Sequence, residues 1–97
     1  MSAIVILEMH VKPGSVEEVK ATLKSVLPDT RAYAGFQSID IYEDLNDKNT
    51  LVFYEKWDTH EHYEKYLAWR TETGVLAQLG TKLTAPPTIR FCERVDV

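Results

Sequence analysis

The 97-residue chain is too short for two hydrophobic cores, so we expect a single domain over residues 1–97. Eleven Lys and Arg against fifteen Asp and Glu give a net charge of −4, which argues against nucleic-acid binding because phosphates require clustered cations. The longest apolar run, residues 3–7, is too short for a membrane span or a signal peptide. The single Cys92 excludes an internal disulfide, and we expect a cytoplasmic protein that does not bind membranes.

The first third of the chain is predicted to form a strand and then a helix. Residues 3–11 begin as an apolar run and continue as an alternating pattern, which is typical of a strand in the middle of a sheet. Ser15 and Glu18 have the spacing of a capping box at the start of a helix. Pro28 is expected to bend or interrupt this helix, and Gly35 to end it.

The rest of the chain continues with strand and helix patterns in a recognisable order. Alternating β-formers on both sides of a polar turn predict an antiparallel hairpin, and a helix and a last strand follow it. The elements expected are a strand over 36–43, a strand over 50–57, a helix from Asp58 or Thr59 to about Arg70, a shorter helix over 75–83 and a strand over 88–95.

The element order β-α-β-β-α-(α)-β predicts an α+β fold, the ferredoxin-like βαββαβ sandwich. In this fold the helices cover one face of a four-stranded antiparallel sheet. A chain of this size is only marginally stable as a monomer, and the outer strands carry more apolar positions than the helices can cover. We therefore expect a homodimer through the helix-free sheet face, with Ile39, Ile41, Ile89 and Phe91 in the interface.

One face of the second predicted helix carries aromatic residues with polar ends and an arginine. A purely structural stripe would usually be aliphatic, because Leu, Ile and Val bring no polar atoms that need partners. Small-molecule pockets use flat aromatic walls and a few polar groups, but such residues also occur at the edge of a core. The stripe consists of His62, Tyr63, Tyr66, Trp69 and Arg70.

Other residue types that often carry chemistry favour structural interpretations here. The four glycines are isolated at turns or caps, so we expect no phosphate-binding loop. Cys92 lies within a predicted strand without a matched His and Asp, as a small buried hydrophobe would. His60 and His62 would point about 200° apart on a helix, so we do not expect them to form a metal site with His10.

Three short motifs follow one another along the chain: Val-Lys-Pro-Gly at 11–14, Gly35-Phe36, and Phe-Tyr-Glu-Lys-Trp at 53–57. In this order and spacing they resemble the antibiotic biosynthesis monooxygenase (ABM) family, over Ile4 to about Phe91. The resemblance implies a ferredoxin-like fold that pairs sheet to sheet as a dimeric α/β barrel. It also implies oxidation of a small phenolic, anthrone or quinol-type substrate by O₂ without a metal or other cofactor, although some members degrade haem or process signalling molecules.

The resemblance carries over to individual residues of this chain. Glu55 and Trp57 match the Glu-x-Trp of the family at the end of the third strand. Many members have a His nine residues after that Trp, where this chain has Tyr66. The haem-degrading branch is a poorer match still, because this chain also has no evident counterpart of its axial His.

We expect a pocket between the sheet and the second helix. His62 is the candidate base, because an imidazole exchanges protons near neutral pH, while Tyr66 and Arg70 would orient and stabilise the substrate anion. A buried guanidinium needs a partner, and Glu55 is the expected one for Arg70. The residues expected to bind substrate are Glu55, Trp57, Tyr63 and Trp69.

Two other functions fit the same residues. The protein could be a non-catalytic dimer that binds a small ligand or has a structural role, or an isomerase or lyase that uses the same side chains as acid and base. A cavity reached by Tyr66, Trp69 and Arg70 would favour substrate chemistry. A collapsed aromatic core would favour the structural role.

Overall fold

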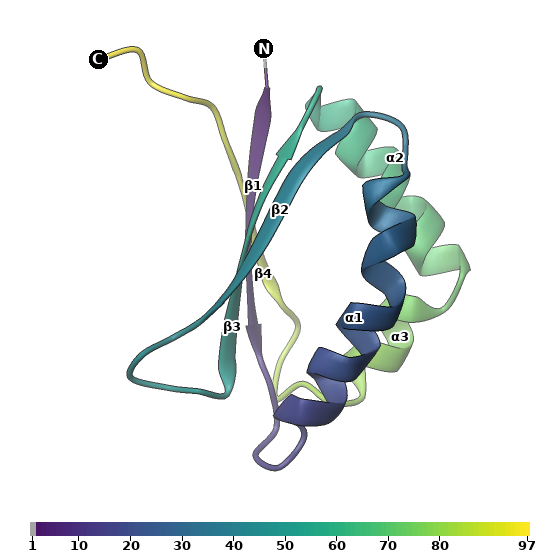
Figure 1. Cartoon of the computed structure of the whole chain (residues 1–97), viewed down its shortest axis with the longest axis vertical. Helices are drawn as coiled ribbons and strands as arrows, with labels where there is room; N and C mark the ends of the chain where they lie inside the picture. Colours follow the sequence, from purple (N-terminus) through teal and green to yellow (C-terminus); the bar gives the residue numbers. More distant parts are fainter. Residues whose placement is uncertain (1) are drawn as a thin grey trace.

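The computed structural model describes residues 2–97, which form the predicted ferredoxin-like α+β sandwich (Figure 1). Its four strands form one antiparallel sheet in the order β2-β3-β1-β4, and the helices all lie over one face of this sheet. The other face is open. In chain order the elements are β1 (Ala3–His10), α1 (Val16–Arg31), β2 (Phe36–Glu43), β3 (Thr50–Trp57), α2 (His60–Glu72), α3 (Val75–Gly80) and β4 (Thr88–Cys92).

Several local features differ from the sequence-based expectations. Ser15 precedes α1, but its side chain makes no capping hydrogen bond, because its backbone already has near-helical angles (φ −106°, ψ −2°). Pro28 lies in the last turn, where it removes one backbone N–H from the helix but does not end it, and the helix continues to Arg31. The third helix ends at Gly80, and β4 pairs with β1 only as far as Cys92.

The pairing register overturns our assignment of the apolar residues on the outer strands. The four residues expected in the dimer interface all face the helices, because each lies opposite a residue of β1 or β3 that is buried beneath them. On each outer strand the more apolar of the two alternating sets of residues faces the helices. The alternation alone did not reveal which face of the sheet this set would occupy. The pairs are Ile39 with Glu55, Ile41 with Phe53, Ile89 with Leu7, and Phe91 with Val5.

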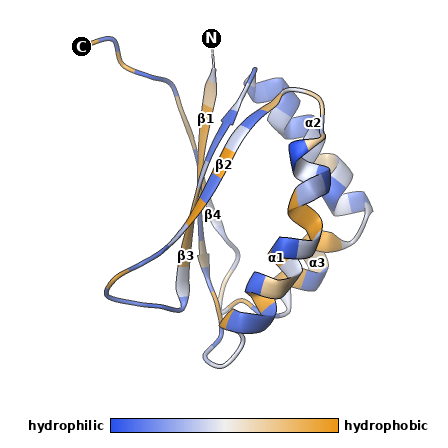
Figure 2. Cartoon of the chain, in the orientation of Figure 1, coloured by the Kyte–Doolittle hydropathy of each residue, from blue (hydrophilic) through white to orange (hydrophobic). Residues whose placement is uncertain are grey.

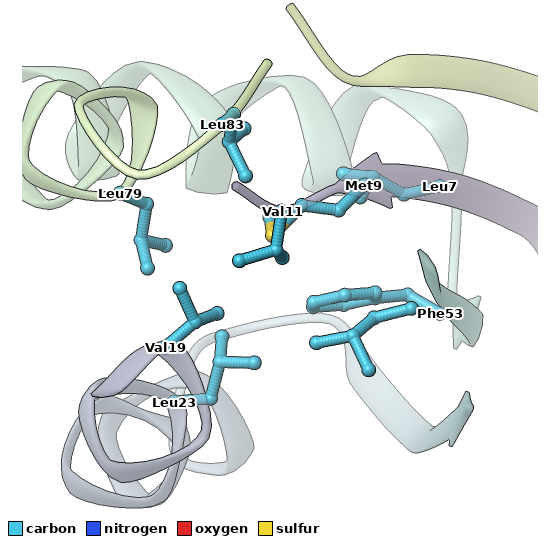
Figure 3. Close-up of a cluster of buried hydrophobic side chains, with 9 residues drawn as sticks. Leu7, Met9, Val11, Val19, Leu23, Phe53, Leu79 and Leu83 are labelled. Atoms are coloured by element: carbon cyan, nitrogen blue, oxygen red, sulfur yellow. The ribbon is translucent and has the colours of Figure 1, made fainter. Parts of the chain in front are cut away.

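The space between the sheet and the helices holds two clusters of buried side chains. The first is aliphatic apart from Phe53, and it lies between the sheet, α1 and α3 (Figure 3). The second contains Val5, Trp57 and Tyr63, with further aromatic side chains packed around them. Figure 2 shows that strongly hydrophobic residues lie along β1 and in patches of α1, between hydrophilic segments of that helix.

The open face of the sheet carries a second set of apolar residues. Ile4 and Ile6 of β1 and Val52 and Tyr54 of β3 alternate with the buried positions of those strands, and all four keep part of their surface exposed.

No helix of the described region is long and apolar enough to cross a membrane.

Candidate active site

A small cavity of about 60 Å³ lies between the sheet and the helices. This is room for a few water molecules. Polar side chains from α1, β3 and α2 interrupt a lining that is otherwise aliphatic and aromatic. The lining residues are Leu7, Met9, Leu23, Val26, Leu27, Thr30, Ile39, Phe53, Glu55, Tyr63, Tyr66, Leu67, Arg70, Val75, Leu76 and Leu79.

Arg70 holds the centre of a hydrogen-bond network on the α1–α2 side of this cavity. Its side chain is only 3% exposed, and its Nε donates to the Tyr66 hydroxyl at 3.0 Å. Its Nη2 donates to the Val26 carbonyl at 2.6 Å and to the Thr30 hydroxyl at 2.9 Å. The hydroxyls of Thr30 and Tyr66 lie 2.7 Å apart, and the guanidinium lies 4.5 Å from the ring centre of Trp69. These contacts fix a guanidinium and a phenol side by side at the cavity.

The prediction that Glu55 pairs with Arg70 is wrong. Glu55 Oε1 accepts a hydrogen bond from Trp57 Nε1 at 3.1 Å, since these two residues are neighbours on one face of β3. Arg70 takes its partners from α1 and from its own helix. Among residues 2–97 neither side chain forms a salt bridge, so Glu55 is a buried carboxyl group without a cationic partner.

Burial changes the acid–base properties of the carboxyl and of a neighbouring phenol. Glu55 is 3% exposed, and desolvation raises its pKa to about 7, against the opposing effect of the Trp57 hydrogen bond. Burial also raises the pKa of the Tyr63 phenol, and the nearby Glu55 carboxylate adds to this effect. Glu55 can therefore gain and lose a proton close to neutral pH, whereas Tyr63 stays protonated.

An aromatic cluster stands behind the cavity. Trp57 is fully buried, and its ring centre lies 4.9 Å from that of Tyr66 and 5.6 Å from that of Tyr63. Trp69 stacks on Tyr33 with ring centres 5.2 Å apart. Of the residues expected to line the pocket, Tyr66 and Arg70 border the cavity, but Trp57 and Trp69 support it from outside.

His62 lies apart from this group, at the first turn of α2. Its Nδ1 is 2.7 Å from the hydroxyl of Thr59, which caps the helix by accepting a hydrogen bond from the His62 backbone N–H. Its imidazole packs against Gly35, where any side chain would collide with the ring and where φ is +88°. The structure therefore brings together Glu55, Tyr63, Tyr66 and Arg70 at the cavity, and His62 is not among the lining residues.

The three histidines do not converge. His10 lies beside Glu8 and Thr50, His60 beside Glu64 and Phe91, and His62 beside Thr59. Within the described chain, no group of three or more His, Cys, Asp or Glu side chains is arranged to hold a metal ion.

The sequence analysis missed the contribution of α1. Thr30 is completely buried, and its hydroxyl bonds both Tyr66 and Arg70. The available signal was a polar residue in the last turn of an amphipathic helix, and such a residue is usually solvated or bonded within its own helix.

Comparison with known proteins places this architecture in a family. The model of the family described as "Antibiotic biosynthesis monooxygenase" matches residues 2–72. The protein named "Putative monooxygenase Rv0793" of Mycobacterium tuberculosis is 30% identical, and the alignment covers 95% of this chain and 90% of that protein.

Solved structures show the same fold along nearly the whole chain. The structure of Rv0793 superposes with a TM-score of 0.79 at 25% identity, covering 100% of this chain and 98% of the other. A conserved protein from Methanosarcina mazei Go1 superposes with a TM-score of 0.89 at 19% identity, covering 98% and 94%. The second likeness concerns the fold alone. Because the family model spans most of the sequence, the chain belongs to the antibiotic biosynthesis monooxygenase family.

Proposed function

We propose that the protein is a cofactor-independent monooxygenase that oxidises a small phenolic, quinol or polyketide-like aromatic molecule with O₂. Membership of the ABM family supports oxygenation. The observation that carries the proposal is the cavity itself, where a carboxyl that titrates near neutral pH shares one lining with a fixed phenol–guanidinium pair. These are the proton-exchanging and anion-stabilising groups that the reaction requires.

The reaction needs no external reductant. Removing a proton from a phenolic substrate, or from a methylene group activated by aromatic rings, gives an anion that can reduce O₂. For a methylene carbon, one oxygen atom becomes the new carbonyl oxygen and the other leaves as water with the two hydrogens of the methylene. The protein therefore has to bind and orient the substrate, accept a proton and stabilise the negative charge.

The residues divide into two roles. Tyr66 and Arg70 are the proposed catalytic groups that orient and stabilise the substrate anion, because their N–H and O–H groups are already fixed beside the cavity. Tyr63 would bind the substrate as a wall of the cavity, and Trp57 and Trp69, which were predicted to bind substrate directly, would support Tyr63 and Tyr66 from outside the lining. A role for His62 as base requires a substrate that reaches the start of α2, and it stays a prediction.

A cavity of about 60 Å³ is smaller than the pockets that usually hold aromatic ligands. Binding must therefore widen it. The lining contributed by α3 is the best candidate to move, because Val75, Leu76 and Leu79 come from a helix of six residues and Leu76 is 36% exposed. An aromatic substrate would displace these aliphatic side chains and meet Tyr66 and Arg70.

We also infer a homodimer through the open face of the sheet, with Ile4, Ile6, Val52 and Tyr54 in place of the residues that the sequence suggested. Burying such side chains stabilises a complex by roughly 1.5–3 kcal/mol each when they are fully covered. Light scattering should therefore give a dimer at micromolar concentration, and Ile6→Glu should give a monomer. A wild-type monomer would reject the dimer.

Oxygen uptake by purified, metal-free protein tests the proposed function. We expect uptake with at least one member of a panel of quinols and anthrones. Tyr66→Phe should lower the uptake about tenfold or more without preventing folding, because the change removes a single hydroxyl group. Absence of uptake with every substrate would contradict the proposal.

The small size of the cavity favours one second candidate, a dimeric protein that binds a small ligand or has a structural role without catalysis. In that case Glu55, Tyr66 and Arg70 would serve only the fold. The two candidates differ in ligand-bound protein: an oxygenase consumes O₂ with a bound quinol or anthrone, whereas a binding protein only takes up the ligand.

A further inference from the structure

We propose that Glu55 is the general base of this oxygenation, taking the proton from the substrate across the cavity from Tyr66 and Arg70. The inference rests on the proposed function and gives it the residue that starts the reaction. Glu55 lies near the end of β3, opposite Val5 on one side and Ile39 on the other. The strands pair through their backbone groups, so pairing does not require a carboxylate on the sheet face that the helices cover.

The surroundings of Glu55 leave one carboxylate oxygen available. Trp57 Nε1 bonds Oε1, and no other described side chain hydrogen-bonds or ion-pairs with the group. In the described region every side-chain nitrogen or oxygen atom that is completely buried has a hydrogen-bond partner. Since Oε2 has none, it keeps some accessible surface, and Glu55 is among the residues that line the cavity.

Arg70 is the cation of this cavity, but its hydrogen bonds go to groups other than Glu55. It lines the same cavity, but its N–H groups donate to Val26, Thr30 and Tyr66. Its Nη1 has no hydrogen-bond partner among the described residues, so the guanidinium can still stabilise charge on the substrate while it forms no ion pair with Glu55. A proton acceptor and anion-stabilising donors that share one lining and form no ion pair with each other are the arrangement that proton abstraction needs.

The acid–base setting agrees with this role. The titratable groups that face the cavity with Glu55 are Tyr63, Tyr66 and Arg70, all from α2. The lining from β1, β2, α1 and α3 contains no titratable side chain. Desolvation raises the pKa of Glu55 to about 7, so at neutral pH a large fraction of the group is ionised, and it is a stronger base than an exposed carboxylate.

The proton can be followed through the whole reaction. Glu55 takes a proton from the activated methylene, and the carbanion adds O₂ to form a peroxide anion on that carbon. Protonated Glu55 returns its proton to the peroxide. The carboxylate then removes the second hydrogen of the carbon as the O–O bond breaks, which leaves the carbonyl product and hydroxide. That hydroxide takes the proton from Glu55 and leaves as water, and the base is restored.

Two measurements on Glu55→Gln separate the base from the overall function. The amide keeps the shape of the side chain and can still accept the bond from Trp57, but it cannot take up a proton. We expect kcat for anthrone oxidation to fall about 100-fold or more. Glu55→Asp should keep part of the activity, and Glu61→Gln, an exposed carboxyl of α2, should behave like wild type.

The second measurement follows the proton alone. Anthrone is incubated with each protein in D₂O without O₂, and deuterium incorporation at its methylene carbon is measured by mass spectrometry. Wild type should accelerate the exchange, and Glu55→Gln should not. If wild type consumes O₂ and Glu55→Gln exchanges deuterium at the wild-type rate, the base assignment is wrong and the function stands. If wild type catalyses neither oxygen uptake nor exchange, the proposed function falls and the base role falls with it.

The pH dependence provides a further check on the same variants. In wild type kcat/KM should rise through about pH 7 as the Glu55 carboxyl loses its proton. Glu55→Gln should lose this rise along with most of its activity. A rise that persists in Glu55→Gln would assign the base to another group.

Discussion

The two ends of the layer between sheet and helices are built differently. At one end Leu7, Val11, Val19, Leu23 and neighbouring side chains pack without a polar atom among them (Figure 3). At the other end the helices cover a carboxyl, a guanidinium and two phenols, all grouped around aromatic rings. The aliphatic end holds the fold together, whereas the polar end leaves a buried carboxyl group without a cation.

The difference indicates that one end of the layer provides stability and the other holds the groups available for chemistry. Burying an ionisable group without a counter-ion costs free energy, and proteins usually avoid it unless the group is used. The small α+β sandwich tolerates this at one end because the other end is filled with well-packed aliphatic side chains. Removing an aliphatic side chain at one end should therefore lower stability, whereas removing the unpaired Glu55 carboxyl at the other end should raise it above neutral pH.

The largest effect is expected at the aliphatic end. Leu23 is 6% exposed between α1 and the sheet, and Leu23→Ala should lower the free energy of unfolding by about 2–5 kcal/mol, since it leaves a cavity. Urea denaturation at pH 7 measures the change. A loss below about 1 kcal/mol would mean that this cluster packs loosely and that the contrast between the two ends is overstated.

The polar end should make stability depend on pH. The pKa of Glu55 is raised in the folded protein, from 4.5 to about 7, so the folded state binds the proton more tightly than the unfolded state. The stabilisation from this tighter proton binding is fully present below about pH 4.5 and is lost as pH rises through about 7. Over this range the free energy of unfolding falls by about 3 kcal/mol because of Glu55.

Glu55→Gln isolates this contribution. Urea denaturation at a series of pH values should show that the variant lacks the decrease between about pH 4.5 and about pH 7, and that it is more stable than wild type at pH 8. The same stability profile in both proteins would show that Glu55 is solvated in the folded state.

The smallest effect is expected within the Arg70 network. Tyr66→Phe removes the hydroxyl that accepts from Arg70 Nε and contacts the Thr30 hydroxyl, while Arg70 keeps two other bonds. The free energy of unfolding should fall by about 1–2 kcal/mol. Thermal and urea denaturation of Tyr66→Phe beside Tyr42→Phe, an exposed tyrosine of β2, give the comparison. Equal losses in the two variants would indicate that the network adds nothing to the fold.

The sequence predicted the fold well because hydrophobic periodicity and turn residues are local signals. The element order, the hairpin and the Thr59 cap all follow from residues close in the chain. Which face of an outer strand meets the helices depends on pairing register, which is not local. Ile39 and Phe91 were therefore placed on the wrong face.

The candidate site could be predicted only in part for the same reason. The stripe of α2 brought Tyr66 and Arg70 together because helical spacing determines which residues share a face. The partners of Arg70 come from α1, about forty residues away, and no spacing rule links Thr30 to Arg70. The assignment of Glu55 as the partner of Arg70 failed at this point, because the guanidinium was satisfied by a carbonyl and a hydroxyl.

The titration of Glu55 itself tests the central claim most directly. Carboxyl carbons of glutamate, labelled with ¹³C, can be followed by NMR as a function of pH, and the Glu55 signal is identified by its loss in Glu55→Gln. A buried carboxyl without a cationic partner predicts a midpoint at about pH 7. A midpoint near pH 4, as in an exposed glutamate, would contradict both the unpaired buried carboxyl and the base derived from it.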